Sequence, residues 1–254
     1  MSDGSTGRRV VIDAHMHVDD VPALGWHFGA DLCIERMDEA GIDRAVVMTI
    51  TDLPEVNSTA LELIAEAVAQ YPDRLYGFAR IHPWYAEAVS LLEYAFAELG
   101  FKGLKLHPVT TSAHPAGEDT VRLIRKAAEH GAPVLVHCGD EPLSTPLAIA
   151  QAARRCPEAT LILGHMGGYA HVDEAIEVAE DLANVVLETS AFPFPEKIRQ
   201  AVERIGGDRV LFGSDGPACS PLLELEKVRL AGLPPDTERL VLGANVKRLL
   251  EAVR

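Results

Sequence analysis

The chain has 254 residues, of which 48% are hydrophobic, and this is enough for one sizeable core of the kind that a single α/β barrel forms. Its 38 acidic residues outnumber its 23 Lys and Arg residues, so the formal net charge is −15. A phosphate backbone or an anionic membrane surface would be repelled by this charge, and neither a nucleic-acid-binding nor a membrane-binding protein is expected. A small anionic substrate held in a local cationic pocket is still compatible with it.

Residues 1–9 are polar and are predicted to form a disordered tail. The sequence contains no signal-peptide core and no run of about 18 apolar residues, so we expect a soluble, cytoplasmic protein. The four cysteines are scattered without a C-x-x-C spacing, which is typical of reduced thiols in the cytosol. They are Cys33, Cys138, Cys156 and Cys219.

Short β-rich runs alternate with helical patterns along the whole chain. The β-rich runs lie at 10–18, 44–50, 75–81, 103–108, 133–139, 160–167, 185–191 and 210–217. Most are nearly continuous apolar runs, as expected for parallel strands that are buried on both faces. Helical patterns between them include 32–42, 59–72, 86–100, 119–131 and 171–184. Several of these end at a glycine, which can adopt the left-handed conformation that terminates a helix.

Eight strands that alternate with helices, without a linker or a sequence repeat, predict a single-domain (β/α)8 TIM barrel over residues 1–254. An open doubly wound sheet is the alternative. It would place a Gly-rich phosphate loop after the first strand, where the sequence DAHMHVDD has none. In a barrel the carboxyl ends of all strands converge on one mouth, so residues at those ends should meet.

Metal-binding and polar side chains occupy these predicted strand ends. His15 and His17 are two residues apart, so they point the same way from the end of the first strand. The later strand ends carry Arg80, His82, Lys105, His107, His137, His165, Glu188, Ser190 and Asp215. Neutral imidazoles with one carboxylate suit a Zn²⁺-like ion that keeps one position for water. Such an ion lowers the pKa of its water toward about 7, and a nearby carboxylate can accept the remaining proton.

Two pairs of strand-end residues suggest how a substrate is bound. Arg80 and His82 share one face of the third strand, and Lys105 and His107 share one face of the fourth. Together they predict a cationic wall for an anionic substrate, with the arginine offering a bidentate fork. The alternative is that the proline after each pair simply ends the strand and that the two histidines cap loops.

The first predicted βα loop, residues 19–31, is rich in aromatic residues. It is compatible with a lid over the barrel mouth and also with ordinary hydrophobic packing. The same loop and the FPFP motif at 192–195 leave a homodimer as an option.

The order of these residues resembles the amidohydrolase superfamily, in which H-x-H follows the first strand, histidines follow the fifth and sixth, and an aspartate follows the eighth. The motifs DAHMHV, GLKLHP, VLVHCG, LGHMGG, FGSDGP and LGANVKRLL are most similar to its amidohydrolase-related branch. The resemblance covers nearly the whole chain and implies the metal ligands His15, His17, His137 and Asp215. It also implies two catalytic residues. Asp215 would serve as a proton shuttle, and His165 would contact the metal-bound water or the substrate as an electrophile or acid/base.

Lys105 leaves the number of metal ions open. In some members of the superfamily a lysine on the fourth strand is carboxylated and bridges two ions, and His137 and His165 would then serve the second ion. The decarboxylase-like branch typically binds one ion, and an unmodified Lys105 could hold a substrate carboxylate. We therefore favour one divalent ion per chain. Zn²⁺ is the expected ion, and Mn²⁺ or Fe²⁺ would accept the same ligands.

The branch contains both hydrolases and non-oxidative decarboxylases, including enzymes like aminocarboxymuconate-semialdehyde decarboxylase. Our primary prediction is a metal-dependent hydrolase that activates water for attack on a small, anionic amide, ester or lactone. The alternative is a metal-dependent non-oxidative decarboxylase of an unsaturated or aromatic carboxylic acid. Arg80 and Lys105 favour that alternative, whereas the short chain disfavours it because the decarboxylases that it resembles tend to be longer. A non-catalytic metal-binding barrel is the third possibility.

Overall fold

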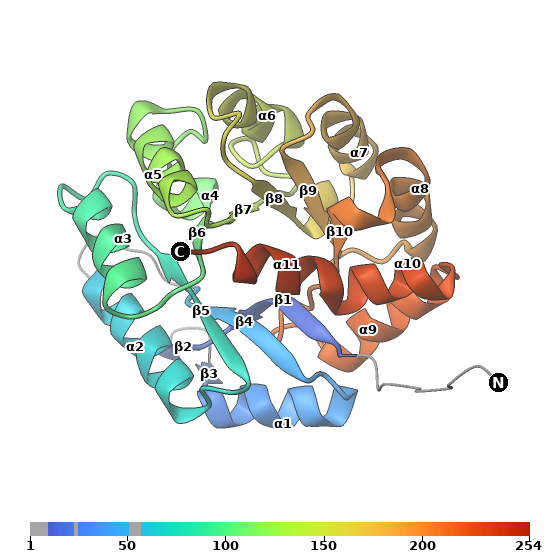
Figure 1. The fold of residues 1–254 in the computed structure, drawn as a ribbon, viewed down its shortest axis with the longest axis horizontal. Helices are drawn as coiled ribbons and strands as arrows, with labels where there is room; N and C mark the ends of the chain where they lie inside the picture. Colours follow the sequence, from blue (N-terminus) through green and yellow to red (C-terminus); the bar gives the residue numbers. More distant parts are fainter. Residues whose placement is uncertain (1–9, 23–24, 51–56) are drawn as a thin grey trace.

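The computed structural model describes residues 10–22, 25–50 and 57–254. The predicted tail at residues 1–9 lies outside the described residues. Parallel strands form a barrel, and helices surround it (Figure 1). This arrangement confirms the predicted single-domain (β/α)8 barrel.

Each of the eight β-rich runs contains one barrel strand, shorter than the run itself. The strands are β1 (Ile12–His17), β4 (Arg44–Met48), β5 (Leu75–Arg80), β6 (Gly103–Leu106), β7 (Val134–His137), β8 (Leu161–Gly164), β9 (Val185–Glu188) and β10 (Val210–Leu211). Neighbours along the chain pair in parallel, in the order β1-β4-β5-β6-β7-β8-β9-β10. The segment after β10 returns to β1, where Ala14 N donates to Phe212 O at 3.0 Å and Asp215 N donates to His15 O at 2.7 Å. These bonds close the barrel.

Most helices lie outside the barrel between successive strands, and the last helix lies across one end of the barrel (Figure 1). The helices are α1 (Ala30–Ala40), α2 (Asn57–Gln70), α3 (Ala88–Ala97), α4 (Pro108–Thr111), α5 (Glu118–Glu129), α6 (Pro146–Arg155), α7 (Val172–Asp181), α8 (Pro195–Ile205), α9 (Pro221–Leu230), α10 (Pro235–Arg239) and α11 (Asn245–Glu251). The five helical patterns named from the sequence correspond to α1, α2, α3, α5 and α7. Proline in the first turn starts α6, α8 and α9, as its fixed φ and missing N–H favour. No helix among the described residues is long and apolar enough to cross a membrane.

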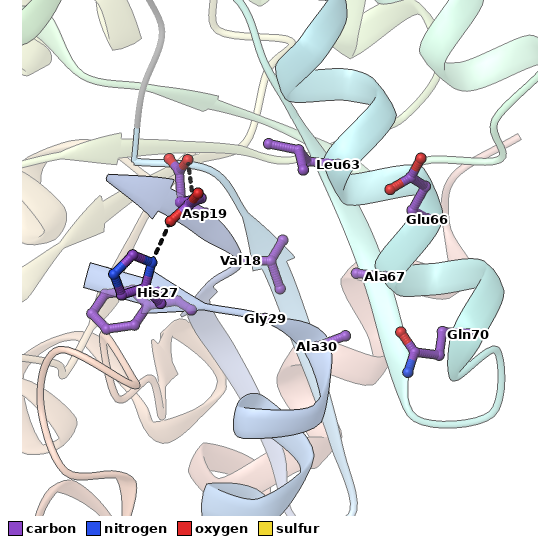
Figure 2. A pocket seen from close by; sticks show the side chains of 11 residues that line it. Val18, Asp19, His27, Gly29, Ala30, Leu63, Glu66, Ala67 and Gln70 are labelled. Carbon is purple, nitrogen blue, oxygen red and sulfur yellow. Dashed lines mark hydrogen bonds and ion pairs between the residues drawn. The ribbon is translucent and has the colours of Figure 1, made fainter. Parts of the chain in front are cut away.

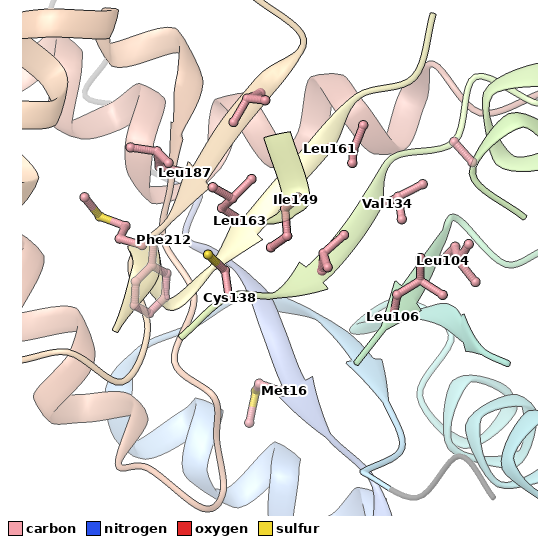
Figure 3. Close-up of a cluster of buried hydrophobic side chains, with 14 of the residues drawn as sticks. Met16, Leu104, Leu106, Val134, Cys138, Ile149, Leu161, Leu163, Leu187 and Phe212 are labelled. Atoms are coloured by element: carbon pink, nitrogen blue, oxygen red, sulfur yellow. The ribbon is translucent and has the colours of Figure 1, made fainter. Parts of the chain in front are cut away.

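Two layers of apolar side chains hold the barrel together. The outer layer packs the strands against the helices, and Figure 3 shows part of it, including Leu104, Leu106 and Val134. The inner layer fills the barrel with residues such as Phe78 and Leu135, and α11 adds Val246 and Leu250 to it. Side chains from the two layers alternate along the regular strands, so a side chain at a strand end points either toward the helices or toward the barrel axis.

A short antiparallel hairpin occupies the first βα connection, where the sequence predicted only an aromatic loop. It pairs β2 (Asp19–Val21) with β3 (Trp26–Phe28). The rings of Trp26 and Phe28 stack with centroids 5.5 Å apart, and His27 between them faces the other way to contact Asp20 at 2.6 Å. The hairpin thus presents one aromatic face and one polar face beside the barrel mouth.

Candidate active site

The candidate site is a cavity of about 170 Å³ at the carboxyl ends of the strands. It is lined by His17, Trp26, Ile50, Arg80, Lys105, His107, His137, His165, Asp215 and Ala218. Successive side chains of a strand point to opposite faces of the sheet, and this explains why several of the lining side chains point inward. Lys105 lies between the outward Leu104 and Leu106 on β6, and His137 follows the inward Leu135 by two residues on β7.

A larger cavity, of about 480 Å³, lies between the hairpin and α2, outside the strand ends (Figure 2). Its lining includes Asp19, His27, Glu66 and Gln70, together with apolar residues such as Leu63. Among the described residues the one group of three or more potential metal donors within 4.8 Å of one another is elsewhere, at the strand ends. The smaller cavity is therefore the better candidate for an active site.

His15, His17 and Asp215 bring their donor atoms together at the base of this cavity. The Nε2 atoms of His17 and His15 lie 2.9 Å and 3.4 Å from Asp215 Oδ1. Donors that bind one ion tetrahedrally at about 2.1 Å are about 3.4 Å apart, so this spacing fits a single divalent ion. His15, His165 and Asp215 also lie within 4.8 Å of one another through one donor atom each.

Backbone strain positions two of these residues. His165 has a φ of 63° and Asp215 a φ of 58°, both in the left-handed region that residues with a Cβ rarely adopt. Such a conformation costs on the order of 1 kcal/mol and turns the chain sharply at a strand end. The glycines beside them, Gly164, Gly213 and Gly216, leave room for these turns. Strained residues that carry functional side chains are common at active sites.

His137, a predicted ligand, is not one of the three residues whose donor atoms lie within 4.8 Å of one another, and it contacts His165 instead. Its Nδ1 is 3.0 Å from His165 Nε2, and its ring stacks on His107 with centroids 3.8 Å apart. Its buried Nε2 has no hydrogen-bond partner among the described residues, and Glu141 Oε2 lies 3.5 Å away. A buried imidazole nitrogen in this state fits a metal ligand. The assignment of His137 as a ligand stays a prediction.

The protonation states of the site suit a metal ion. Burial lowers the pKa values of His15, His137 and His165, so these imidazoles are neutral and can offer a lone pair. Burial alone would raise the pKa of Asp215, but the hydrogen bond from His17 and the charge interaction with His15 hold it well below its usual value. Asp215 is therefore a carboxylate.

Arg80 and Lys105 contribute cations to the cavity wall, and each side chain is only 1% exposed. Arg80 donates to the backbone oxygens of Thr49 and Ile50 at 3.3 Å and 2.9 Å. Lys105 Nζ lies 2.8 Å from His15 Nε2, next to the donor group. The two cations of the predicted wall thus line the same cavity, and their binding of an anion stays a prediction.

The two histidines predicted for the same wall behave differently. His82 does not line the cavity; its Nδ1 accepts from Trp84 N at 3.2 Å, so it caps a turn. His107 does line the cavity, but burial and the charge of Arg80 lower its pKa to about 2. It is neutral and adds no positive charge. Of the four residues proposed for the wall, Arg80, Lys105 and His107 line the cavity, and His107 is uncharged.

Three residues at the site received no role from the sequence. Trp26, from the hairpin, is half-buried and lines the cavity. Asp13 accepts from the backbone N–H groups of His15 and Ser214, and burial raises its pKa to about 8. Glu188 accepts from His15 Nδ1 at 3.0 Å. Its position was predictable, since it follows the inward Val186 by two residues.

Comparisons with known proteins agree on the family and the fold. A family model described as "Amidohydrolase" matches residues 12–251. No match was found among curated proteins. Among solved structures, 5-carboxyvanillate decarboxylase from Sphingomonas paucimobilis has a TM-score of 0.74 and 16% identity, with 97% of this chain and 100% of that chain covered. The 2,6-dihydroxybenzoate decarboxylase from Rhizobium has a TM-score of 0.76 and 17% identity, with 96% and 99% covered.

A third similar structure is a dihydroxybenzoic acid decarboxylase from Polaromonas sp. JS666 with bound manganese and the inhibitor 2-nitroresorcinol, at a TM-score of 0.76 and 18% identity, with 96% and 97% covered. These similar structures are decarboxylases, and this contradicts the primary prediction of hydrolysis and favours its alternative. The length of the chain no longer speaks against that alternative, because the similarity spans nearly all of each decarboxylase chain.

Proposed function

Because this chain belongs to the amidohydrolase family, we propose that it is a metal-dependent decarboxylase that releases CO₂ from a small unsaturated or aromatic carboxylic acid. The observation that carries the proposal is the cavity at the strand ends, where a donor set for a divalent ion adjoins two buried cations, Arg80 and Lys105. The similar decarboxylase structures support it at the level of the fold.

We propose that His15, His17 and Asp215 hold the ion, with His137 as the fourth ligand of the predicted set and His165 beside them. A bound divalent ion would supply Lewis-acid polarisation of the substrate oxygens. Zn²⁺ was expected from the ligand types, and Mn²⁺ is an equal candidate because two of the similar decarboxylases were crystallised with manganese. One ion per chain remains our proposal.

Side chains of the cavity would bind the substrate and supply the proton. Arg80 and Lys105 would bind the carboxylate by charge-assisted hydrogen bonds, and Trp26 would offer an apolar face to an unsaturated ring. The bond between the carboxylate carbon and the substrate then breaks, and its electron pair stays on the substrate carbon. That carbon takes one proton, for which Asp215 and His165 are the candidate donors. Since Asp215 is ionised and His165 is neutral at rest, either residue must first take up this proton from water.

The proposal is tested by supplying Mn²⁺- or Zn²⁺-loaded protein with hydroxybenzoates and small unsaturated acids, and in parallel with esters, lactones and amides. We expect one CO₂ per substrate consumed and, in D₂O, one deuterium at the carbon that lost CO₂. Asp215→Asn should lower the rate about 10²- to 10⁴-fold, as expected for loss of a proton donor, while Asp236→Asn on exposed α10 should not. Hydrolysis of an ester, lactone or amide, with no CO₂ from any acid, would overturn the proposal.

A further inference from the structure

Glu188, at the end of β9, is fully buried, and its carboxyl group collects four hydrogen-bond donors. Oε2 faces His15 Nδ1 at 3.0 Å, Ser190 Oγ at 2.9 Å and His165 N at 3.3 Å, and Oε1 faces Ser190 N at 2.5 Å. A carboxylate only accepts hydrogen bonds, so it can satisfy all four donors. One side chain thus contacts two histidines of the candidate metal site.

The direction of each bond can be followed from Glu188 outward. His15 must donate from Nδ1, which leaves the lone pair on its Nε2. The single hydroxyl proton of Ser190 goes to Glu188, so Ser190 Oγ accepts from His165 Nδ1, 2.8 Å away. His165 Nε2 then carries a lone pair and accepts from His137 Nδ1 at 3.0 Å.

The hydrogen bond from His137 to His165 accounts for the unpartnered ring nitrogen of His137. If His137 donates from Nδ1, its proton-free nitrogen is Nε2, which is the buried atom without a hydrogen-bond partner among the described residues. The lone pairs that this network does not use are those of His15 Nε2 and His137 Nε2. His15 Nε2 lies 3.4 Å from Asp215 Oδ1 in the donor group and 2.8 Å from Lys105 Nζ, which must turn away from it when an ion binds.

The backbone around Glu188 leaves room for its carboxyl group. A Cβ atom at Gly213, just after β10, would lie 2.2 Å from Glu188 Oε1. A Cβ at Gly164, at the end of β8, would lie 3.6 Å from Oε2. Any side chain at Gly213 would therefore displace the carboxyl group from its donors.

We propose that Glu188 is a positioning residue that sets the tautomers of His15, His165 and His137 and thereby directs the Nε2 lone pairs of His15 and His137 to a divalent ion. Ser190 relays this effect from Glu188 to His165. The inference rests on the metal site of the proposed function and is independent of whether the reaction is decarboxylation.

Two measurements on Glu188→Gln test the proposal. Titration calorimetry with Mn²⁺ should show an affinity about 10- to 100-fold weaker than in the unchanged protein, as is typical when a metal-binding histidine loses its carboxylate partner. Histidine ¹⁵N chemical shifts of the metal-free protein should report Nδ1–H tautomers for His15, His165 and His137, and an altered population for at least His15 in the variant. Glu174→Gln is the control, because Glu174 is also partly buried and accepts a hydrogen bond from Leu147 N. It should change neither the Mn²⁺ affinity nor the histidine tautomers.

Ser190→Ala provides a second variant in case Glu188→Gln does not fold. It should alter the tautomers of His165 and His137 but leave that of His15, which contacts Glu188 directly. Unchanged Mn²⁺ affinity and unchanged tautomers in the folded variants would overturn the proposal. If Glu188→Gln binds Mn²⁺ more weakly and the unchanged protein releases no CO₂, the role of Glu188 is upheld and the proposed decarboxylation is overturned. Absence of Mn²⁺ and Zn²⁺ binding by the unchanged protein would overturn both.

Discussion

Single residues at the barrel mouth carry opposite charges within a few ångströms. Lys105 is 1% exposed, and its ammonium group lies 2.8 Å from His15 Nε2, whereas Asp215 Oδ1 lies 3.4 Å from the same nitrogen. Lys105 lines the cavity, where an ammonium group forms a strong, charge-assisted hydrogen bond with a carboxylate. We therefore assign Lys105 to substrate binding.

Lys105→Met removes this charge and keeps most of the side-chain volume. We expect KM for the carboxylic acid substrate to rise about 10- to 100-fold, because a hydrogen bond to a charged group contributes roughly 1.5–3 kcal/mol. Steady-state kinetics at saturating metal ion measure this change. Lys247→Met, on the exposed face of α11, is the matched control. An unchanged KM in Lys105→Met would contradict the assignment.

The sequence-based prediction differs from the structure in the charge that it expected of two histidines. His82 and His107 were expected to add positive charge to the wall on the basis of their spacing from Arg80 and Lys105. Charge depends on burial and on neighbouring charges, which spacing does not report. The structure turns His82 toward Trp84 and lowers the pKa of His107 to about 2.

At the level of elements, irregularity in β1 decides where its histidines point. Ile12 and Ala14 belong to the inner layer, so regular alternation would send His15 toward the helices. The pairing of β1 with β4 shifts register between Asp13 and Met16, and Met16 joins the outer layer. An extra residue of this kind reverses the alternation that follows it. His15 and His17 therefore face the barrel axis.

A second feature of the strands concerns packing beneath the site. Phe78 on β5 lies opposite Gly103 on β6, and a Cβ at Gly103 would be 2.4 Å from the Phe78 ring. Phe78 belongs to the inner layer that fills the barrel. Glycine at this position thus makes space for an aromatic ring two residues before Lys105 on the same strand.

Gly103→Ala should overpack the barrel interior and lower the free energy of unfolding by about 1–3 kcal/mol. Urea denaturation followed by circular dichroism measures the change. Gly29→Ala is the control, because a Cβ at Gly29 would have no atom of the described residues within 4 Å apart from its neighbours in the chain. Equal stability of the two variants would show that the Phe78 ring moves aside without cost.

At the scale of the whole molecule, the barrel buries neutral histidines from several strands at one end. Burial lowers the pKa values of His15, His107, His137 and His165. In the unfolded chain a histidine has a pKa of about 6.5. Between the two pKa values the unfolded chain binds more protons than the folded chain, so the free energy of unfolding falls as the pH drops below about 6.5. Above that pH these histidines have no effect.

We therefore expect the metal-free protein to lose stability between about pH 6.5 and 5.5, with each such histidine contributing up to about 1.4 kcal/mol per pH unit. Urea denaturation at a series of pH values, in the presence of a chelator, measures this slope. His107→Gln should reduce this slope relative to the unchanged protein. The same slope in the variant and in the unchanged protein would contradict neutral burial of His107.

The barrel could be predicted from the sequence, as could the position of most residues that line the cavity at its mouth. Apolar parallel strands that alternate with helices bury both faces of the sheet when they close into a barrel. Because side chains alternate along a strand with a period of two residues, Lys105, His137 and Glu188 point into the barrel. These properties are local, so they can be recognised in a linear chain. The same locality explains why the amidohydrolase family was identified correctly from short motifs.

Only the tertiary structure decided how these residues act together. The shift in β1, the neutral state of His107, and the contact between Glu188 and His15 across 173 positions all depend on segments that meet only after folding. The choice of hydrolysis over decarboxylation was wrong for a related reason. Both reactions use the same donor types, and the strand ends encode those types but not the shape or the charge of the cavity that selects the substrate.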